Sequence, residues 1–191
     1  MRVQFGEDKY KSVLMALWKI CFPEDSAVFV DLYFANLYKN EEVLITVIDD
    51  QPIAFLQMLP CQIQIEEKNY SGGYIYGVMT HPDYRHKGYM NQLLTTALSS
   101  LKERACDYVF LIPQSPELAA TYAKYGFQTP LLSGESLGEG LARILPTTAQ
   151  LDVAKQDGSD KDSKNDGMLL RLNDLAPLIR RWKAFAMLED F

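Results

Sequence analysis

The sequence has few cysteines and no long hydrophobic run. Cys21, Cys61 and Cys106 are odd in number and far apart, and no C-x-x-C pair occurs. Disulfide frameworks and structural zinc sites use paired cysteines, so the simplest interpretation is three reduced thiols in a cytoplasmic protein. No run of about 18 apolar residues suggests a membrane span. The first residues, MRVQFGEDKYK, lack the apolar core of a signal peptide. We therefore expect no association with a membrane.

Positive charge is also scarce. The chain has 19 Lys and Arg against 25 Asp and Glu, a net charge of -6. General nucleic-acid binders usually present a basic face, so nucleic-acid binding is not expected. Histidine is equally rare: His81 and His86 flank a proline turn, with no Cys or carboxylate at metal-ligand spacing. No metal site is predicted.

What is present fits one domain of ordinary size. The 191 residues are 48% hydrophobic, which is enough for a sizeable core. Residues 152–167, DVAKQDGSDKDSKNDG, contain almost no apolar side chains and cannot bury enough surface to stay ordered. We predict a domain over 1–150, a flexible polar linker over 151–167, and a strand and helix over 168–191 that pack on the domain. The alternative is that 168–191 begins a further domain.

Hydrophobic periodicity predicts two helices and then strands in the first half of the chain. The helices are expected over 8–21 and 26–38, the second with Phe29, Leu32, Tyr33 and Leu37 facing inward. Strands are expected over 42–48, 52–65 and 70–80. Gly72-Gly73 within the third strand predicts a β-bulge.

The second half continues the alternation. The apolar run YVFLI at 108–112 is typical of a strand buried on both faces. Ser115 followed by Pro116 predicts a helix start, and Gly126 predicts that this helix ends at Tyr125. Two further strands and a terminal helix are expected over 127–132, 168–172 and 174–188.

The stretch from Tyr76 to Leu101 carries the chemistry. A strand ends at Thr80, His81-Pro82-Asp83 breaks it, and a helix with one apolar stripe starts near Gly88. Between them lies the basic turn Arg85-His86-Lys87-Gly88. A helix N-terminus offers unpaired N–H groups and a positive dipole end, and a glycine lets a ligand approach the backbone. This turn therefore predicts a phosphate site.

Two segments resemble the GNAT superfamily of acyl-CoA-dependent N-acetyltransferases. VMTHPDYRHKGYM at 78–90 is similar to the cofactor signature R/Q-x-x-G-x-G/A, which follows a strand and a proline. SPELAATYAKYGF at 115–127 is similar to N-x-x-A-x-x-x-Y-x-K-x-G-F. The resemblance covers roughly residues 40–132. It implies an α/β fold, with a mixed, mostly antiparallel twisted sheet flanked by helices on both faces and splayed after Thr80.

The resemblance also implies a cofactor, acetyl-CoA, and residues that hold it. Val78, Met79 and Thr80 would bind the pantetheine arm through main-chain groups, with the Met79 N–H as the oxyanion donor. The implied phosphate-binding residues are Arg85, His86, Lys87, Gly88, Tyr89 and Met90. Tyr122 would donate a proton to the departing thiolate, and Ser115 occupies the position of the family's asparagine.

This sequence departs from the family pattern in two ways. Met90 replaces a small residue, so its side chain must turn away from the pyrophosphate. The strand Tyr74–Val78 lacks the glutamate that serves many members as general base, so the base is not assigned. Tyr74 and Tyr76 share one face of that strand and fit either an acceptor pocket or the core.

The implied function is acetyl transfer from acetyl-CoA to a primary amine by direct attack. The rival is a non-catalytic acyl-CoA-binding sensor or regulatory module that uses the same pocket. A P-loop nucleotide site is disfavoured because G-x-x-x-x-G-K-[ST] is absent. The acceptor is left open between small amine, antibiotic, peptide N-terminus and lysine, and the oligomeric state is open, a dimer included.

Overall fold

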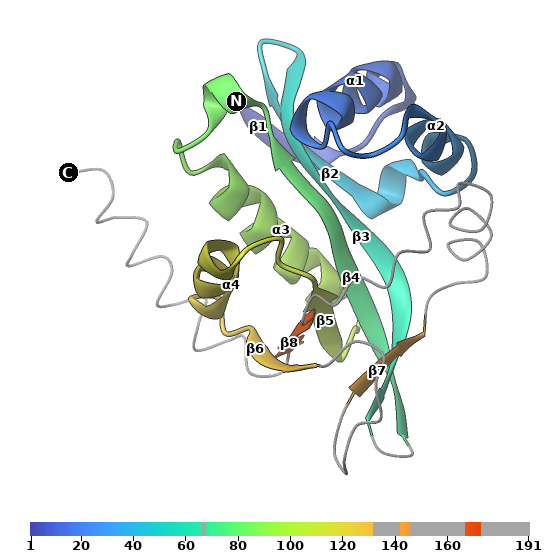
Figure 1. Ribbon diagram of the computed structural model, residues 1–191, viewed down its shortest axis with the longest axis vertical. Helices are drawn as coiled ribbons and strands as arrows, with labels where there is room; N and C mark the ends of the chain where they lie inside the picture. Colours follow the sequence, from blue (N-terminus) through green and yellow to red (C-terminus); the bar gives the residue numbers. More distant parts are fainter. Residues whose placement is uncertain (66–67, 132–141, 146–166, 173–191) are drawn as a thin grey trace.

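A single twisted sheet organises the computed structural model, which describes residues 1–65, 68–131, 142–145 and 167–172. The eight strands of this described part run in the order β1-β2-β3-β4-β5-β8-β6, and β7 pairs with β3 (Figure 1). All pairs are antiparallel except β4–β5. The strands are β1 Arg2–Phe5, β2 Val43–Ile48, β3 Gln51–Ile65, β4 Lys68–Thr80, β5 Tyr108–Leu111, β6 Gln128–Leu131, β7 Ala142–Leu145 and β8 Gly167–Arg171.

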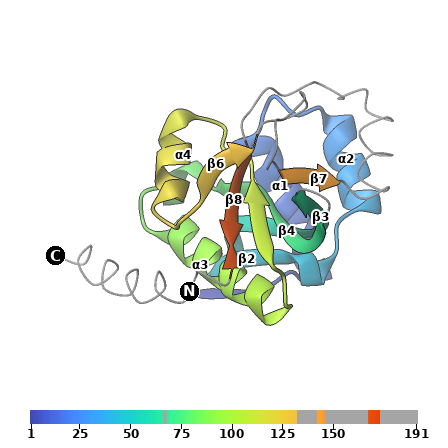
Figure 2. The ribbon, with the colours of Figure 1, turned by 90° about the horizontal axis from the view of Figure 1, so that it is seen from below.

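Helices cover both faces of the sheet, as predicted. One face carries α1 Lys11–Cys21 and α2 Ala27–Asn36, and the other carries α3 Tyr89–Glu103 and α4 Pro116–Ala123. Figure 2 shows α3 and α4 on the opposite side of the strands from α2. The mixed, mostly antiparallel α/β class is therefore confirmed.

Each face has its own hydrophobic core. The α3-side core joins the apolar stripe of α3 (Leu93, Leu94, Ala97, Leu98 and Leu101) to the sheet and to Tyr122. The α1–α2-side core is rich in aromatic rings, among them Trp18, Tyr33 and Phe34, with Tyr74 and Tyr76 packed against it. No helix of the described residues has the length and apolar content needed to cross a bilayer.

The most consequential irregularity is a bulge in β4, and it does not lie where the sequence predicted it. Gly72 and Gly73 pair regularly with Cys61 and Pro60. A Cβ on Gly73 would lie 2.5 Å from Leu101, so close packing explains this glycine. The register instead shifts farther along, where Phe55 pairs with Met79 but Gln57 pairs with Tyr76. β4 thus has one extra residue between Tyr76 and Met79, and Gly77 lies there with φ +57°.

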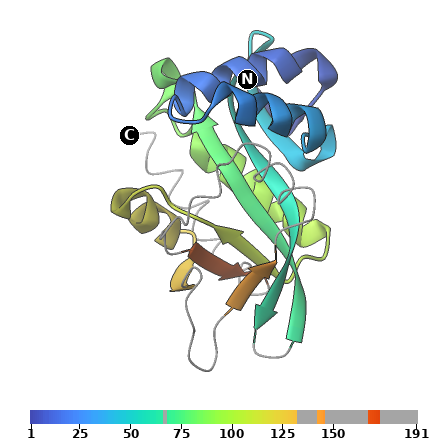
Figure 3. The same ribbon diagram turned by 45° about the vertical axis from the view of Figure 1, so that its right-hand side comes forward.

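β4 and β5 separate early. They pair in parallel only from Gly72–Tyr74 to Tyr108–Phe110, whereas β4 continues to Thr80. Figure 3 shows the upper part of β4 running away from β5. The strands therefore diverge after Tyr74, six residues before the expected Thr80, because β5 ends at Leu111 while β4 turns at the bulge.

Several smaller expectations are resolved as well. β1 and β7 were not expected, α4 ends at Ala123 instead of Tyr125, and β8 confirms the strand expected over 168–172. The inward face of α2 was partly wrong, since Val30, Tyr33 and Phe34 are the buried residues. Residues 151–166 of the expected linker lie outside the described residues. The helix expected over 174–188 lies outside them as well.

Candidate functional site

The end of β4 leads through a tight turn into the N-terminus of α3. Pro82–Tyr84 forms a single 3-10 turn, and His86 and Gly88 both have positive φ, +62° and +75°. Gly88 is the N-cap of α3 in left-handed conformation. A Cβ on Gly88 would meet no atom within 4 Å. The left-handed backbone, and not a steric contact, therefore favours glycine here, and the space beside it is open to a ligand.

The N–H groups of this turn are available. Among the described residues, no backbone or side-chain acceptor receives the N–H of any residue from His86 to Asn91, whereas the N–H of Gln92 donates to the Gly88 carbonyl at 3.1 Å. Unpaired N–H groups at the start of a 15-residue helix favour an anion. The backbone of the predicted phosphate site thus has the geometry that such a site needs.

The two cations of the turn fold back on it. Arg85 Nε donates to the Thr80 carbonyl at 3.1 Å, and Lys87 Nζ donates to the Asp83 carbonyl at 3.0 Å. Lys87 also lies 5.2 Å from the centre of the Tyr84 ring. Both side chains are exposed, so each can rotate toward an anion at little cost. Tyr89 and Met90 turn the other way and pack against the α3-side core.

Along the last residues of β4, the backbone N–H groups point alternately toward β3 and away from it. His81 N–H donates to the Ile53 carbonyl of β3 at 2.8 Å, and Met79 pairs with Phe55 in the same register. Because N–H directions alternate along a strand, the Met79 N–H also faces β3. The N–H groups of Val78 and Thr80 face the opposite edge, where β5 has separated. This edge carries the backbone groups that a ligand between β4 and β5 would meet.

Tyr122 lies on α4 within the α3-side core. Its side chain is 5% exposed, its ring meets Phe127 edge-on at 6.0 Å, and burial raises the pKa of its hydroxyl to about 12. Val78 packs against the same core, whereas the Met79 side chain belongs to the α1–α2-side core. The structure thus brings Tyr122 and Val78 to one face of the sheet and separates both from the Met79 side chain.

Ser115 has a structural task. Its hydroxyl accepts a hydrogen bond from the Leu118 N–H at 3.3 Å and caps α4, and Pro116 follows it. The predicted N-cap is therefore confirmed. The contact of Ser115 with the cofactor stays a prediction.

Sequence reasoning missed two features that shape this region. One is the bulge at Gly77, whose only signal was a lone glycine in a strand. The other is a 2.6 Å hydrogen bond from the Tyr125 hydroxyl to Asn91 Oδ1, which links α4 to the first turns of α3. No periodicity reveals a bond between residues 34 positions apart. No group of three or more potential metal ligands occurs among the described residues.

One of the comparisons with known proteins identifies a family, and another shows a shared fold. The sequence matches the family model for the acetyltransferase (GNAT) domain over residues 3–129. No curated protein matches it. Among solved structures, a GNAT family N-acetyltransferase from Escherichia coli in complex with CoA shares 16% identity, with a TM-score of 0.61 over 90% of this chain and 81% of that one. An acetyltransferase from Brucella melitensis in complex with acetyl-CoA shares 14%, with a TM-score of 0.58 over 78% and 97%.

Some similar structures are much longer. A probable N-acyltransferase from Enterococcus faecalis V583 shares 20% identity with a TM-score of 0.59, and the match covers 68% of this chain but only 33% of that one. The chain thus spans about a third of the length of the first proteins it matches. At these identities the likeness concerns the fold.

Proposed function

Because the chain belongs to the GNAT acetyltransferase family, we propose that it transfers an acetyl group from acetyl-CoA to a primary amine by direct attack in a ternary complex. One observation carries the proposal. The unpaired N–H groups of residues 86–91 lie directly after the free edge of β4, so a phosphate site adjoins a backbone edge that can hold an extended arm.

The cofactor's phosphates would bind at the start of α3. The N–H groups from His86 to Met90 donate to them, and Arg85 and Lys87 rotate from their backbone partners to add charge. Gly88 keeps the approach clear. Met90 interferes little, because its side chain packs toward the core. The bound cofactor supplies the thioester whose carbonyl carbon the amine attacks.

The pantetheine arm would extend along β4 at Val78, Met79 and Thr80. Of these, Val78 and Thr80 have the N–H groups that face the opening, since Met79 faces β3. We therefore assign the oxyanion donor to Val78 in preference to Met79. A backbone donor aimed at the developing oxyanion is worth about 10²–10³ in rate.

Tyr122 would supply the proton for the departing thiolate. A pKa of about 12 keeps the hydroxyl protonated but makes full proton transfer to the thiolate unfavourable, because the conjugate thiol has an ordinary pKa of about 8.5. A thiolate held in the same dry environment also has a raised pKa, which narrows this gap. Tyr122 thus acts first as a hydrogen-bond donor to sulfur, and the proton follows as charge develops.

The second candidate is a non-catalytic acyl-CoA sensor. The observation in its favour is the β4 sequence from Tyr74 to Val78, which has no carboxylate to act as base. The amine acceptor, whether a small molecule or a peptide, is the partner that separates the two functions, since only the enzyme needs one.

The test combines binding with turnover. Acetyl-CoA at about 100 times its dissociation constant should stabilise the fold by roughly 2.7 kcal/mol, visible as a higher melting temperature. Release of free CoA thiol is then followed with a panel of primary amines. Binding with amine-dependent release supports the enzyme, and binding without release for any amine supports the sensor. No thermal shift with acetyl-CoA contradicts both.

A further inference from the structure

Two buried polar side chains of the α1–α2 face have no partner among the described residues. Gln57 on β3 is 0% exposed, and neither its Oε1 nor its Nε2 makes a hydrogen bond there. Tyr33 on α2 is 2% exposed, and its hydroxyl also has no hydrogen-bond partner among the described residues. A buried polar group without a partner destabilises the fold, so such groups call for a ligand or another explanation.

Gln57 lies opposite the bulge of β4. Its register partner is Tyr76, and a Cβ placed on Gly77 would come within 3.1 Å of Gln57 Nε2. Gly77 immediately precedes Val78, whose N–H is the proposed oxyanion donor. The unpaired amide therefore lies within about one residue of the reacting centre, on the face away from Tyr122.

Aromatic rings connect Gln57 to Tyr33 and toward the surface. The Tyr76 ring lies 6.0 Å from that of Tyr33, 5.7 Å from that of Trp18 and 5.4 Å from that of Tyr74. Trp18 also approaches the Gly77 position, with a ring carbon 3.9 Å from the Cβ placed there. Tyr74 and Tyr76 are both partly exposed. A small molecule that enters past these two rings has to move them aside to reach the Gln57 amide.

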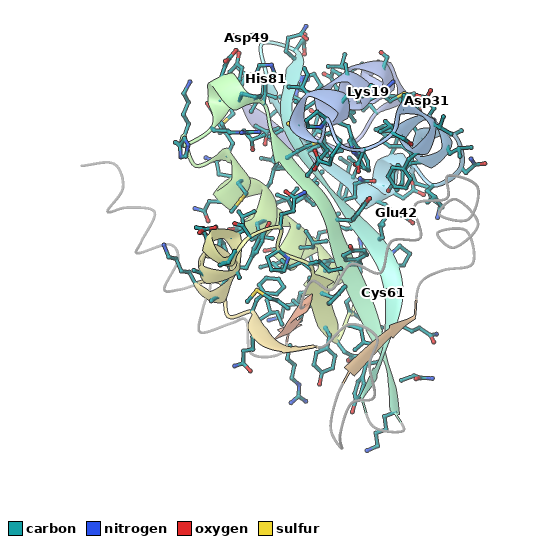
Figure 4. All side chains as sticks on the ribbon, viewed as in Figure 1. Lys19, Asp31, Glu42, Asp49, Cys61 and His81 are labelled. Carbon is teal, nitrogen blue, oxygen red and sulfur yellow. The ribbon has the colours of Figure 1, made fainter. Side chains whose placement is uncertain are left out.

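The charges around this face favour a cation. Asp25 accepts a 2.7 Å hydrogen bond from Trp18 Nε1. Burial raises the pKa of Tyr76, and the charges of Tyr74 and Asp25 add to that rise. Glu42, 8% exposed, lies beside β3 (Figure 4). Glu42 is neutralised by Lys39 at 2.9 Å, and Asp31 by Lys19 at 3.3 Å, so Asp25 is the carboxylate that carries the argument for a cation. Aromatic faces and carboxylates both attract an ammonium group.

We propose that Gln57 and Tyr33 bind the acceptor amine, and that the acceptor is a small cationic amine which enters past Tyr74 and Tyr76. This inference rests on the proposed acetyl transfer. The ammonium releases one proton to solvent before it attacks, and the N–H groups of the neutral amine donate to Gln57 Oε1 and the Tyr33 oxygen, which aims the nitrogen lone pair at the thioester beside Val78. The second proton that nitrogen loses when the amide forms balances the proton that Tyr122 gives to the leaving sulfur. The acceptor then attacks from the α1–α2 face while Tyr122 serves the leaving sulfur from the α3 face.

The test distinguishes acceptor binding from the alternative that these buried polar atoms have no function. Gln57→Leu and Tyr33→Phe remove the polar atoms and keep most of the volume. If those atoms had no function, both variants would be at least as stable as the wild type and fully active. We expect unchanged or raised melting temperatures, an unchanged thermal shift with acetyl-CoA, and a fall in kcat/KM for the amine of at least 10-fold. The KM for acetyl-CoA should not change.

Thr46→Val is the matched control. Thr46 on β2 is 0% exposed, and its Oγ1 is also unpaired among the described residues. Its register partner is Ala54, which belongs to the α3-side core, so the hydroxyl lies on the other face. Thr46→Val should keep wild-type kinetics with equal or greater stability. Should Gln57→Leu fold poorly, Gln57→Met gives a second, unbranched replacement.

The outcomes differ for the two proposals. If the wild type acetylates amines and both variants match its kcat/KM, the acceptor role of Gln57 and Tyr33 is wrong and acetyl transfer stands. If loss of activity accompanies loss of the acetyl-CoA shift, the variants disturb the cofactor site and the acceptor role is again wrong. If the wild type binds acetyl-CoA but acetylates no amine, the proposed function fails and the acceptor role fails with it.

Discussion

Tyr125 holds Asn91 with a 2.6 Å hydrogen bond, and this contact ties the end of α4 to the first turns of α3. Tyr125 is 7% exposed, so water competes little for the bond. The two helices carry the two halves of the proposed site, Tyr122 on α4 and the phosphate-binding turn before α3. The bond therefore adds to the core packing that holds the two halves together.

Removing this bond should cost stability. Tyr125→Phe and Asn91→Ala should each lower the free energy of unfolding by about 1 kcal/mol. In a double-mutant cycle by denaturant unfolding, the double variant should lose less than the sum of the two single losses, with a coupling of at least 0.5 kcal/mol, roughly the lower limit for residues in contact. Additive losses would mean that the two side chains do not interact in solution.

Gly88→Val should abolish the thermal shift with acetyl-CoA. A β-branched residue is strained at φ +75° and would move the N–H groups of the turn away from the phosphates. Gly88→Asn is the control for backbone strain, because asparagine tolerates left-handed backbone and meets no protein atom within 4 Å of its Cβ. It should fold with wild-type stability, and any loss of its thermal shift with acetyl-CoA then measures the open space that the cofactor needs. A normal shift in the valine variant would place the phosphates elsewhere.

Tyr122→Phe should reduce turnover by about 10²–10⁴, the usual contribution of a general acid, with little change in acetyl-CoA affinity. Tyr10→Phe is a matched control, since Tyr10 is also 5% exposed but belongs to the α1–α2-side core. Near-normal turnover on the true acceptor would make Tyr122 a packing residue. Loss of cofactor binding would make its hydroxyl a ligand contact.

The pKa of Tyr122 also predicts how stability depends on pH. The folded value of about 12 exceeds the unfolded value of about 10. Below pH 10 both states keep the proton. Between about pH 10 and 12 the unfolded state loses it while the folded state retains it, so stability falls as pH rises. Burial also raises the pKa values of Tyr33, Tyr38, Tyr74 and Tyr76. Tyrosinate absorbance should therefore rise together with unfolding, and Tyr122→Phe should flatten part of the decline.

Ala105→Gly should stabilise the protein by about 1 kcal/mol. α3 ends in a Schellman motif, in which the Ala105 N–H donates to Lys102 and the Cys106 N–H donates to Leu101. Ala105 adopts φ +58° there, a conformation that costs a residue with a Cβ about 1–2 kcal/mol. Thermal melts compare the variant with the wild type. A lower melting temperature would show that the motif is absent in solution.

The predictions from sequence were most accurate where a pattern allowed a single structural interpretation. The stripe of α3 has a single apolar face, and the cap at Ser115 is marked by Pro116. In α2, by contrast, AVFVDLYFAN is apolar nearly all round, so periodicity could not select Val30 and Phe34 for burial. The four-residue β1, with no buried residue, gives no alternation to detect.

The candidate site was predicted unevenly for similar reasons. The turn at Arg85–Gly88 is local, and its backbone follows from a proline, a glycine and a helix start. Which N–H of β4 faces the opening depends on the register with β3, and the register depends on the bulge. Gly72-Gly73 and Gly77 are equally plausible bulge sites by sequence. Only the packing of Leu101 and the pairing of Gln57 distinguish them.

The position of β8 has a consequence for how the protein is made. β8 lies between β5 and β6, although both of those strands precede it in the chain. On the ribosome, β5 therefore emerges with one edge unpaired, and β6 emerges without its hydrogen-bonding neighbour. The sheet that carries the site can close only after residue 171 has been synthesised. Until then the nascent chain exposes strand edges that can pair with other chains, so its first protection has to come from a chaperone or from the helices already packed on β2–β4.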